Sequence, residues 1–172
     1  MRRVVTGLGP DGRSQIVSDG PAPQSVVLER LGGATFETLW QVTTPPESAS
    51  AGGEPAIPLF RFPPGLAGFF RSVIPPDSLV DRSDMNAIYE EMRRKLPDLI
   101  PLVDPGRGPG MHKHATIDFV VVVSGRVRLV LEDGEADLEA GDTVVQRGTW
   151  HAWRNPWDEP CVIAGAILAA VG

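Results

Sequence analysis

Several residue types and patterns are scarce in this sequence of 172 residues, and each scarcity excludes a structural feature or a class of protein. The single cysteine, Cys161, excludes an internal disulfide, and its apolar neighbours favour a buried thiol over a reactive one. The longest apolar runs, 120–123 and 161–171, are shorter than the ~20 residues that a membrane-spanning helix needs. The first residues contain no apolar stretch typical of a signal peptide. We therefore expect a cytoplasmic protein without contact with a membrane.

Basic residues are also in the minority. The chain has 16 Lys and Arg against 22 Asp and Glu, which gives a formal net charge of −6, and the two signs are interspersed. A protein that binds nucleic acid needs a basic surface to neutralise phosphates. We therefore expect no nucleic-acid partner. The length is that of about one domain.

Turn-forming residues, in contrast, are abundant. The 19 glycines and 17 prolines separate short segments rich in β-forming residues, which is typical of an all-β domain. Ser124-Gly125, Asp133-Gly134 and Ala140-Gly141 are tight turns that keep neighbouring strands antiparallel. The sequence predicts strands at Arg2–Thr6, Gln15–Val17, Phe36–Thr43, Phe69–Ile74, Met111–Val123, Arg126–Leu131, Glu135–Leu138, Asp142–Gln146, His151–Arg154 and Cys161–Leu168.

The first part of the chain looks different from the rest. Its three predicted strands form an N-terminal arm, and residues 44–65 are so rich in proline that they predict a long loop. Such a loop can be a lid, a dimer contact or simply disordered. We therefore divide the chain into residues 1–68, an arm and a long loop that pack on a barrel, and residues 69–172, the barrel itself.

One segment has the period of a helix. It begins after Ser83, where Ser83 or Asp84 can cap the first turn, and Pro97 ends it. The apolar side chains that recur at steps of three and four residues are Met85, Ile88, Tyr89, Met92 and Leu96.

The residues that carry chemistry follow one another at every second position. Strand alternation places His112, His114, Thr116 and Asp118 on one face, and Val120 and Val122 continue it. This face suits the inside of a barrel that is polar near its mouth and apolar deeper in. Imidazole nitrogen and carboxylate oxygen are ligands of divalent first-row metals. The chain has only 3 histidines, and the third, His151, lies on a later predicted strand that can complete the site.

The spacing of these residues resembles the two sequence motifs of the cupin superfamily. The first motif is Gly, five residues, His-x-His, three or four residues, Glu, six residues and Gly. The second runs from Gly through a Pro-x-Gly turn to His and, four positions later, Asn. The corresponding residues here are Gly106, His112, His114, Asp118 and Gly125 for the first motif, and Gly141, Gly148, His151 and Asn155 for the second.

Three departures from the motifs affect the site. Asp118 replaces the glutamate, and Gln146-Arg147 replaces the proline of the turn. The interval from Gly141 to His151 is one residue shorter than in the usual motif. A one-residue change in register turns a side chain to the opposite face, although a bulge restores its direction.

The resemblance implies a cupin fold, a jelly-roll barrel of the double-stranded β-helix type, similar to a bacterial subgroup of small single-barrel cupins. It implies one divalent metal on His112, His114, Asp118 and His151, with Fe2+ favoured and Zn2+, Mn2+ or Ni2+ as alternatives. An iron site suits a mononuclear oxygenase, and the other metals suit a lyase, isomerase or dehydratase. A non-catalytic binding module is the third possibility. Cupins are commonly dimers, so we also expect a homodimer.

The remaining residues of the inward face predict the substrate pocket, although no catalytic acid or base is identified. Trp153 shares the face of His151 and is suited to wall a pocket for a planar or apolar molecule. We therefore expect a small organic substrate, aromatic or otherwise planar, in a pocket lined by Thr116, Val120, Val122 and Trp153.

Overall fold

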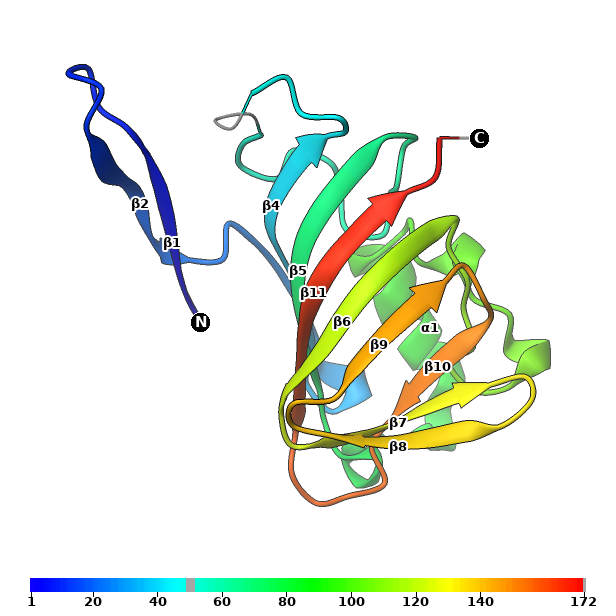
Figure 1. Ribbon diagram of the computed structural model, residues 1–172. Helices are drawn as coiled ribbons and strands as arrows, with labels where there is room; N and C mark the ends of the chain where they lie inside the picture. Colours follow the sequence, from blue (N-terminus) through cyan, green and yellow to red (C-terminus); the bar gives the residue numbers. More distant parts are fainter. Residues whose placement is uncertain (49–51, 172) are drawn as a thin grey trace.

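The computed structural model describes residues 1–48 and 52–171, and most of its regular structure is β-strand (Figure 1). The strands are β1 (Arg2–Leu8), β2 (Ser14–Pro21), β3 (Gln24–Leu28), β4 (Ala34–Thr43), β5 (Leu66–Ile74), β6 (Thr116–Ser124), β7 (Arg126–Leu131), β8 (Glu135–Glu139), β9 (Thr143–Arg147), β10 (His151–Arg154) and β11 (Cys161–Ala169). Helix α1 spans Met85–Lys95, and short 3-10 turns lie at Glu29–Leu31, Asp77–Leu79, Arg82–Asp84, Ile100–Leu102 and Pro105–Arg107. The expectation of an all-β protein with one short helix is confirmed.

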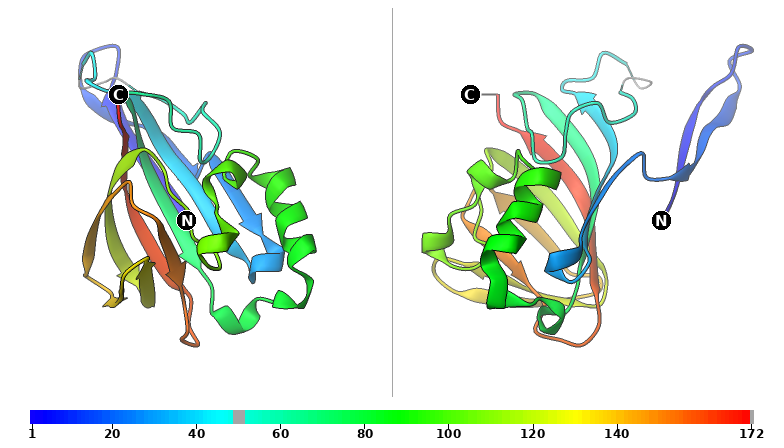
Figure 2. Two further views of the ribbon diagram at one scale, coloured as in Figure 1. Left: turned by 90° about the vertical axis from the view of Figure 1, so that its right-hand side faces the viewer. Right: turned by 180° about the vertical axis from the view of Figure 1, so that it is seen from behind.

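Two antiparallel sheets form the body of the protein. The large one has the strand order β3-β4-β5-β11-β6-β9, and the small one has the order β10-β7-β8. Helix α1 lies on one side of the large sheet, behind it in Figure 1 and beside it in the left view of Figure 2. The face of the large sheet that looks toward α1 is called the inner face below, and the opposite one the outer face.

The arm is smaller than the sequence predicts. Only β1 and β2 form it, as a separate two-stranded sheet that projects from the body (Figures 1 and 2). Strand β4, which we expected in the arm, pairs with β5 in the large sheet, and β3, which we did not expect, pairs with β4. Strand β5 begins at Leu66 and so spans the expected division at residues 68 and 69.

Helix α1 follows the predicted pattern at both ends. Of the two candidate caps, Asp84 is the one used, since its carboxylate accepts a hydrogen bond of 3.0 Å from the Ala87 amide. The helix ends where the Leu96 amide donates to the Met92 carbonyl. Its apolar side packs into a core of Leu28, Ala34, Ile88, Met92, Leu96 and Leu99, where each fully buried large side chain contributes about 1.5–3 kcal/mol.

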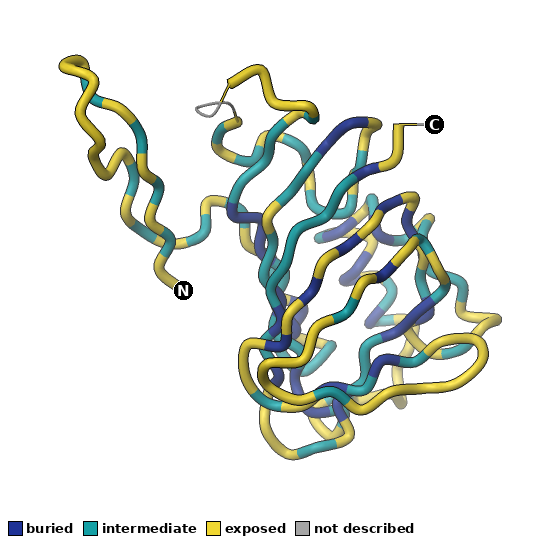
Figure 3. The backbone as a smooth tube through the Cα atoms, viewed as in Figure 1, coloured by how far each residue is buried: buried dark blue, intermediate teal, exposed yellow. Residues whose placement is uncertain are grey.

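Strand β6 alternates as expected, but it begins later. Buried and exposed residues alternate along it from Thr116 to Val123 (Figure 3). The predicted strand Met111–Val123 is wrong in its first part, because residues 111–115 have no continuous strand partner. Among the described residues, His112 makes only isolated bridges, to Val103 and to His151. The first two candidate ligands therefore stand on a loop that leads into β6.

Strands β6 and β11 approach each other closely at Gly165. A Cβ atom at this position would lie 2.0 Å from the Phe119 carbonyl oxygen, so only glycine fits. The second apolar core lies beside this contact and contains Val120, Val122, Val127, Cys161 and Ile163. In the part of the chain that is described, no helix is long and apolar enough to cross a membrane.

Candidate metal centre

His112 and His151 are paired through their backbones. The His112 amide donates to the His151 carbonyl at 2.9 Å, and the His151 amide donates to the His112 carbonyl at 3.0 Å. Their ring centroids are 4.3 Å apart, and His151 is only 3% exposed. Gly148, with a φ of +58°, makes the turn before β10. This left-handed turn lets His151 point inward despite the shortened interval in the second motif.

His114 completes the group from the loop before β6. Its ring centroid lies 5.1 Å from that of His112 and 5.9 Å from that of His151. It is buried beneath Phe62, whose ring centroid is 4.9 Å away. The structure therefore brings together three histidines that the sequence separates by up to 39 positions.

Backbone carbonyls fix the protonation of two of the rings. Nδ1 of His112 lies 2.8 Å from the Gly110 carbonyl oxygen, and Nδ1 of His151 lies 2.9 Å from that of Thr149. A carbonyl can only accept, so each Nδ1–H donates and the lone pair of the neutral ring is on Nε2. Metal-binding histidines are commonly oriented by such a bond from their other nitrogen.

Two polar atoms at the site are buried without a hydrogen-bond partner in the part of the chain that the structure describes. They are Nε2 of His114 and Oδ1 of Asp118, and the other oxygen of Asp118 lies 4.0 Å from Nδ1 of His114. Leaving a buried polar atom unsatisfied costs about 1–3 kcal/mol, so such atoms call for an explanation. A ligand that accepts a lone pair from Nε2 of His114 and another from Oδ1 of Asp118 would explain why both atoms lack a protein partner.

Burial moves the pKa values of these groups toward their neutral forms. Desolvation lowers the pKa of His114 to about 3, helped by the nearby His112 and His151. Desolvation and His112 lower the pKa of His151 to about 4, and desolvation lowers the pKa of His112. Desolvation raises the pKa of Asp118 to about 6, against a hydrogen bond with Thr116. At neutral pH the three imidazoles are therefore uncharged, which is the form that binds metals.

The residues fit a divalent first-row metal by donor type and by burial. Three neutral imidazoles and one carboxylate are the donor set that such ions take, and the two unpartnered atoms belong to it. Across residues 1–48 and 52–171, no three His, Cys, Asp or Glu side chains already stand in the geometry of a metal site. Binding would therefore require the rings to turn so that their free nitrogens share one point.

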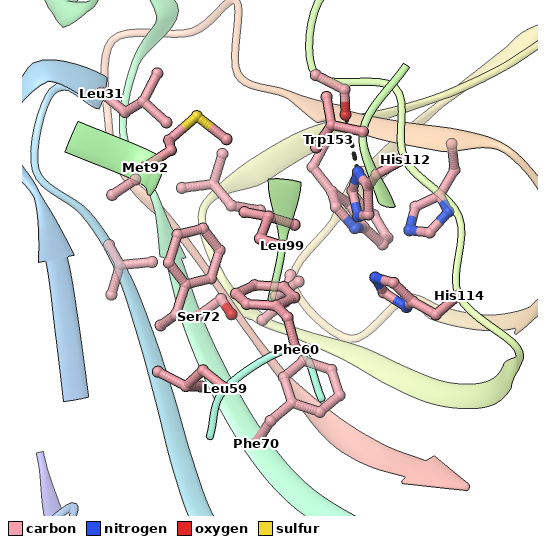
Figure 4. Close-up of a pocket in the computed structure, with 18 of the residues that line it drawn as sticks. Leu31, Leu59, Phe60, Phe70, Ser72, Met92, Leu99, His112, His114 and Trp153 are labelled. Carbon is pink, nitrogen blue, oxygen red and sulfur yellow. Dashed lines mark hydrogen bonds between the residues drawn. The ribbon is translucent and has the colours of Figure 1, made fainter. Parts of the chain in front are cut away.

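A cavity of about 280 Å³ extends from the histidines to α1 (Figure 4). His112, His114 and Trp153 lie at one end of the view, and Met92 lies at the other. Of the four residues predicted for the pocket, Val120 and Trp153 line this cavity. Thr116 and Val122 are buried but are not among the described lining residues.

The long loop contributes a wall that the sequence did not predict. Residues 58–62 line the cavity, and the Phe60 ring packs edge-on against Phe36 with 5.2 Å between centroids. Phe60 has a φ of +65°, a strained conformation for a bulky residue that tertiary packing must hold. The one available signal was two phenylalanines, Phe60 and Phe62, in a loop otherwise rich in proline.

Charged residues lie elsewhere on the cavity lining. Arg154 binds Asp77 through Nε and Nη2 at 3.0 and 2.7 Å, and Nη2 of Arg82 lies 3.6 Å from the same carboxylate. Two guanidinium groups therefore share one carboxylate, which leaves a net positive charge. Sequence analysis missed this cluster, because Asp77 and Arg154 are 77 positions apart.

Comparison with known proteins places the site within a known domain. Residues 101–168 match the family described as "Cupin domain". This match covers β6 to β10, most of β11 and all four candidate ligands, and it confirms the cupin barrel that the motifs predicted.

The similar curated proteins are fungal. The chain is 40% identical over 90 residues to "Oryzines biosynthesis cluster protein J" of Aspergillus oryzae, a match that covers 47% of this chain and 50% of that protein. It is 36% identical over 64 residues to "Cupin-domain-containing oxidoreductase srdD" of Neurospora crassa, covering 36% of this chain and 33% of that protein. The chain thus spans half or less of the length of these relatives, and they give no support for the narrower bacterial subgroup.

Solved structures include similar domains. A cupin-2 domain, Rru_A2000 from Rhodospirillum rubrum, aligns over 85% of this chain and 69% of its own with a TM-score of 0.45 and 12% identity. A cupin 2 conserved barrel domain protein from Salinispora arenicola aligns over 60% of this chain and 64% of its own, with a TM-score of 0.39 and 20% identity.

Proposed function

We propose that this chain, whose residues 101–168 form a cupin domain, is a metal-dependent oxygenase for a small organic molecule with a flat apolar body. The observation that carries the proposal is the pair of buried, unpartnered atoms on His114 and Asp118 beside an apolar cavity. The similar Neurospora crassa protein srdD is named an oxidoreductase, which supports an oxidation over other reactions.

In this proposal the protein side chains hold one divalent ion and neutralise part of its charge. His112 and His151 present Nε2, because their Nδ1–H groups are engaged by backbone carbonyls. His114 adds its free Nε2, and Asp118 supplies the single negative charge. Iron, when bound, would supply a redox centre at which substrate and dioxygen meet.

The cavity walls would select the substrate. Val120, Trp153 and Phe62 present apolar and aromatic surfaces beside the histidines, which suits a flat apolar body and excludes water. The cavity volume of about 280 Å³ lies just below the range of roughly 300–1,000 Å³ that is typical of small-molecule pockets. The substrate must therefore be small.

The positive cluster would bind an acidic group of that substrate. Arg154 is held by a forked pair of hydrogen bonds to Asp77, whereas Arg82 makes, among residues 1–48 and 52–171, only the longer contact to the same carboxylate. A guanidinium binds a carboxylate through two parallel hydrogen bonds. We therefore propose Arg82 as the group that binds a substrate carboxylate.

One observation favours a second candidate function, a lyase or isomerase with a redox-inert metal. The pKa of Asp118 is raised to about 6 by burial, which is near the optimum for a general base at neutral pH. In that case Asp118 would remove a proton from the substrate instead of binding the ion directly.

Turnover assays with defined metals separate these functions. Metal-free protein is loaded with Fe2+ or with Zn2+ and mixed with a panel of small planar carboxylic acids, and oxygen uptake and products are measured. Oxygen-dependent turnover with iron alone supports the oxygenase, and oxygen-independent turnover supports the second candidate. Binding without any turnover would contradict both.

A matched pair of variants locates the activity. His151→Ala should abolish turnover, whereas Lys113→Ala should retain it, because the Lys113 ammonium lies over the Trp150 ring instead of among the histidines. Equal activity in both variants would contradict the proposed site.

A further inference from the structure

Gln146 is a buried polar residue beside the candidate metal centre. It belongs to β9, is 4% exposed and lines the cavity. The strand register pairs it directly with Asp118 on β6, so the two side chains lie on the same face of the large sheet. In antiparallel sheets the Cβ atoms of such a pair are about 4.5–5.5 Å apart. Gln146 is therefore a direct neighbour of one proposed metal ligand.

The side-chain amide of Gln146 is hydrogen-bonded to Thr149. Its Nε2 donates to the Thr149 carbonyl oxygen at 3.2 Å and also to the Thr149 hydroxyl. A carbonyl oxygen can only accept, so the nitrogen of the amide, and not its oxygen, must face Thr149. The same carbonyl oxygen accepts the Nδ1–H bond of His151 at 2.9 Å. Gln146 and His151 thus share one acceptor atom.

The turn that contains Thr149 has little freedom to move toward β6. A Cβ atom at Gly148 would lie 3.2 Å from the His114 carbonyl oxygen and 3.5 Å from that of Thr116. Movement away from β6 is restrained by side chains. In the part of the chain that is described, the side-chain hydrogen bonds to this turn come from Gln146 and His151. Gln146 therefore anchors the turn that presents His151.

The cupin motif has a proline where this chain has Gln146. A proline ring fixes the φ angle of its own residue and so restrains the backbone that enters the turn. A glutamine backbone lacks this restraint, and here the hydrogen bonds of the side chain restrain the turn instead. The departure from the motif and the inward direction of His151 are thus explained together.

We propose that Gln146 is a positioning residue that sets the direction of the His151 ring through the Thr149 carbonyl. This inference rests on the proposed function, in which Nε2 of His151 holds the metal ion. With the carbonyl fixed, the Nδ1–H bond keeps Nε2 directed into the site. If the carbonyl turns away, the ring can occupy several orientations, and metal binding must then select one of them. Loss of a residue that orients a metal-binding histidine commonly weakens metal binding about 10- to 100-fold.

Zinc affinity tests the effect on the metal site. Gln146→Met keeps the length of the side chain and removes both amide donors. Calorimetry with metal-free protein should give Zn2+ binding about 10- to 100-fold weaker than in the wild type. Circular dichroism and urea unfolding show whether the variant is folded.

Gln41→Met is the matched control. Gln41 also lines the cavity and lies in the same row of the large sheet as Gln146. The row runs across the paired strands through Gly68, Ile167 and Asp118. The side-chain oxygen of Gln41 accepts from two amides of the long loop, each at 3.0 Å, instead of holding the turn before β10. The same substitution there should leave the zinc affinity unchanged.

Proton exchange in metal-free protein tests the positioning itself. The Nδ1–H proton of His151 should exchange with solvent about tenfold faster in Gln146→Met, the effect expected for the loss of about one hydrogen bond. The Nδ1–H proton of His112 is an internal control, because its acceptor is the Gly110 carbonyl and not that of Thr149. Its exchange should be unchanged, whereas a general loosening of the protein would accelerate both. NMR spectroscopy measures both rates.

The wild-type protein alone provides a further test. The side-chain amide protons of Gln146 should exchange at least about tenfold more slowly than those of the exposed Gln15, because they are buried and hydrogen-bonded. Equal rates would overturn the inference whether or not the variant folds.

The outcomes distinguish this inference from the proposed function. Equal zinc affinity in wild type and Gln146→Met, or equal acceleration of both ring protons, would overturn the positioning role while the metal site stands. A wild-type protein that binds no metal would contradict the proposed function, whereas a selective response of the His151 ring proton would still support the positioning.

Discussion

His112 and His151 lie directly opposite each other, joined by two backbone hydrogen bonds of 2.9 and 3.0 Å, and their rings meet with 4.3 Å between centroids. This pairing connects the loop before β6 to the start of β10. The backbone hydrogen bonds hold the loop that carries His112 against the strand that carries His151. The fold therefore fixes where both rings start from, and only the side-chain torsions remain free.

Asp118 is expected to destabilise the protein in the absence of metal. Burial raises the pKa of its carboxyl group to about 6 from 3.8, so the ionised form at pH 7 is costly. Asp118→Asn should therefore raise the unfolding free energy of the metal-free protein by roughly 1–3 kcal/mol, at about 1.4 kcal/mol per pKa unit. The same change should weaken metal binding at least about tenfold.

Urea unfolding with and without Zn2+ measures both effects. Asp133→Asn, which removes the same charge from an exposed turn, should change neither. A destabilised metal-free Asp118→Asn protein would show that the carboxylate has a structural partner instead.

The stability of the metal-free protein should fall in mild acid. The unfolded chain protonates its histidines near pH 6.5, whereas burial lowers the pKa of folded His114 to about 3 and of His151 to about 4. Since the unfolded chain binds protons that the folded histidines cannot, the free energy of unfolding is unaffected above about pH 6.5 and decreases as the pH falls below it. Asp118 acts in the opposite sense, because its raised pKa stabilises the folded state at low pH.

Three histidines with lowered pKa values outweigh one carboxylate with a raised pKa, so the metal-free protein should lose at least about 1.4 kcal/mol of stability per pH unit between pH 6 and 4. Urea unfolding of metal-free protein at a series of pH values measures this slope. In Asp118→Asn the opposing group is absent, so the slope should become steeper. A flat profile would mean that the histidines are solvated and protonate normally.

Arg82 should determine the affinity for acidic ligands. In metal-free protein, trans-cinnamate should bind more tightly than the uncharged trans-cinnamamide. Arg82→Gln should weaken cinnamate binding about 10- to 100-fold, as expected for hydrogen bonds to a charged group. It should leave binding of the amide unchanged, and calorimetry measures all four affinities.

Arg61→Gln provides the matched control. Arg61 also lines the cavity, but its guanidinium is engaged by Asp98 at 3.0 and 3.1 Å. Equal affinities for the acid and the amide in the wild-type protein would exclude a carboxylate site at this cluster.

Gly165 should tolerate no side chain. Its Cβ would lie 2.0 Å from the Phe119 carbonyl oxygen, so Gly165→Ala must separate β6 from β11 at a cost of about 3 kcal/mol or more. Gly68→Ala on β5 has its nearest contact at 4.0 Å and should change stability by at most about 1 kcal/mol. Chemical denaturation compares the two variants, and equal stabilities would contradict the close approach.

The sequence predicted the elements whose residues repeat locally. The alternation along β6 places Asp118 and Val120 on the buried face, and the period of α1 and its Asp84 cap are visible as short patterns. The loop before β6 keeps the same alternation for His112 and His114 without a continuous strand partner, so the motif predicted the site better than it predicted the strand.

Contacts between distant segments could not be predicted in this way. Phe62 reaches His114 from the long loop, and Asp77 reaches Arg154 across 77 positions. Such contacts depend on how the elements pack, and no local period encodes packing. The direction of His151 was uncertain for the same reason, because it depends on the left-handed turn at Gly148.

The most direct test of the proposed site is a calorimetric titration of metal-free protein with Zn2+, combined with elemental analysis of protein purified without chelator. The account predicts one ion per chain, bound at least about 100-fold more weakly by His114→Ala and unchanged by Lys113→Ala. Less than stoichiometric metal in the wild-type protein, or equal affinity in His114→Ala, would contradict it.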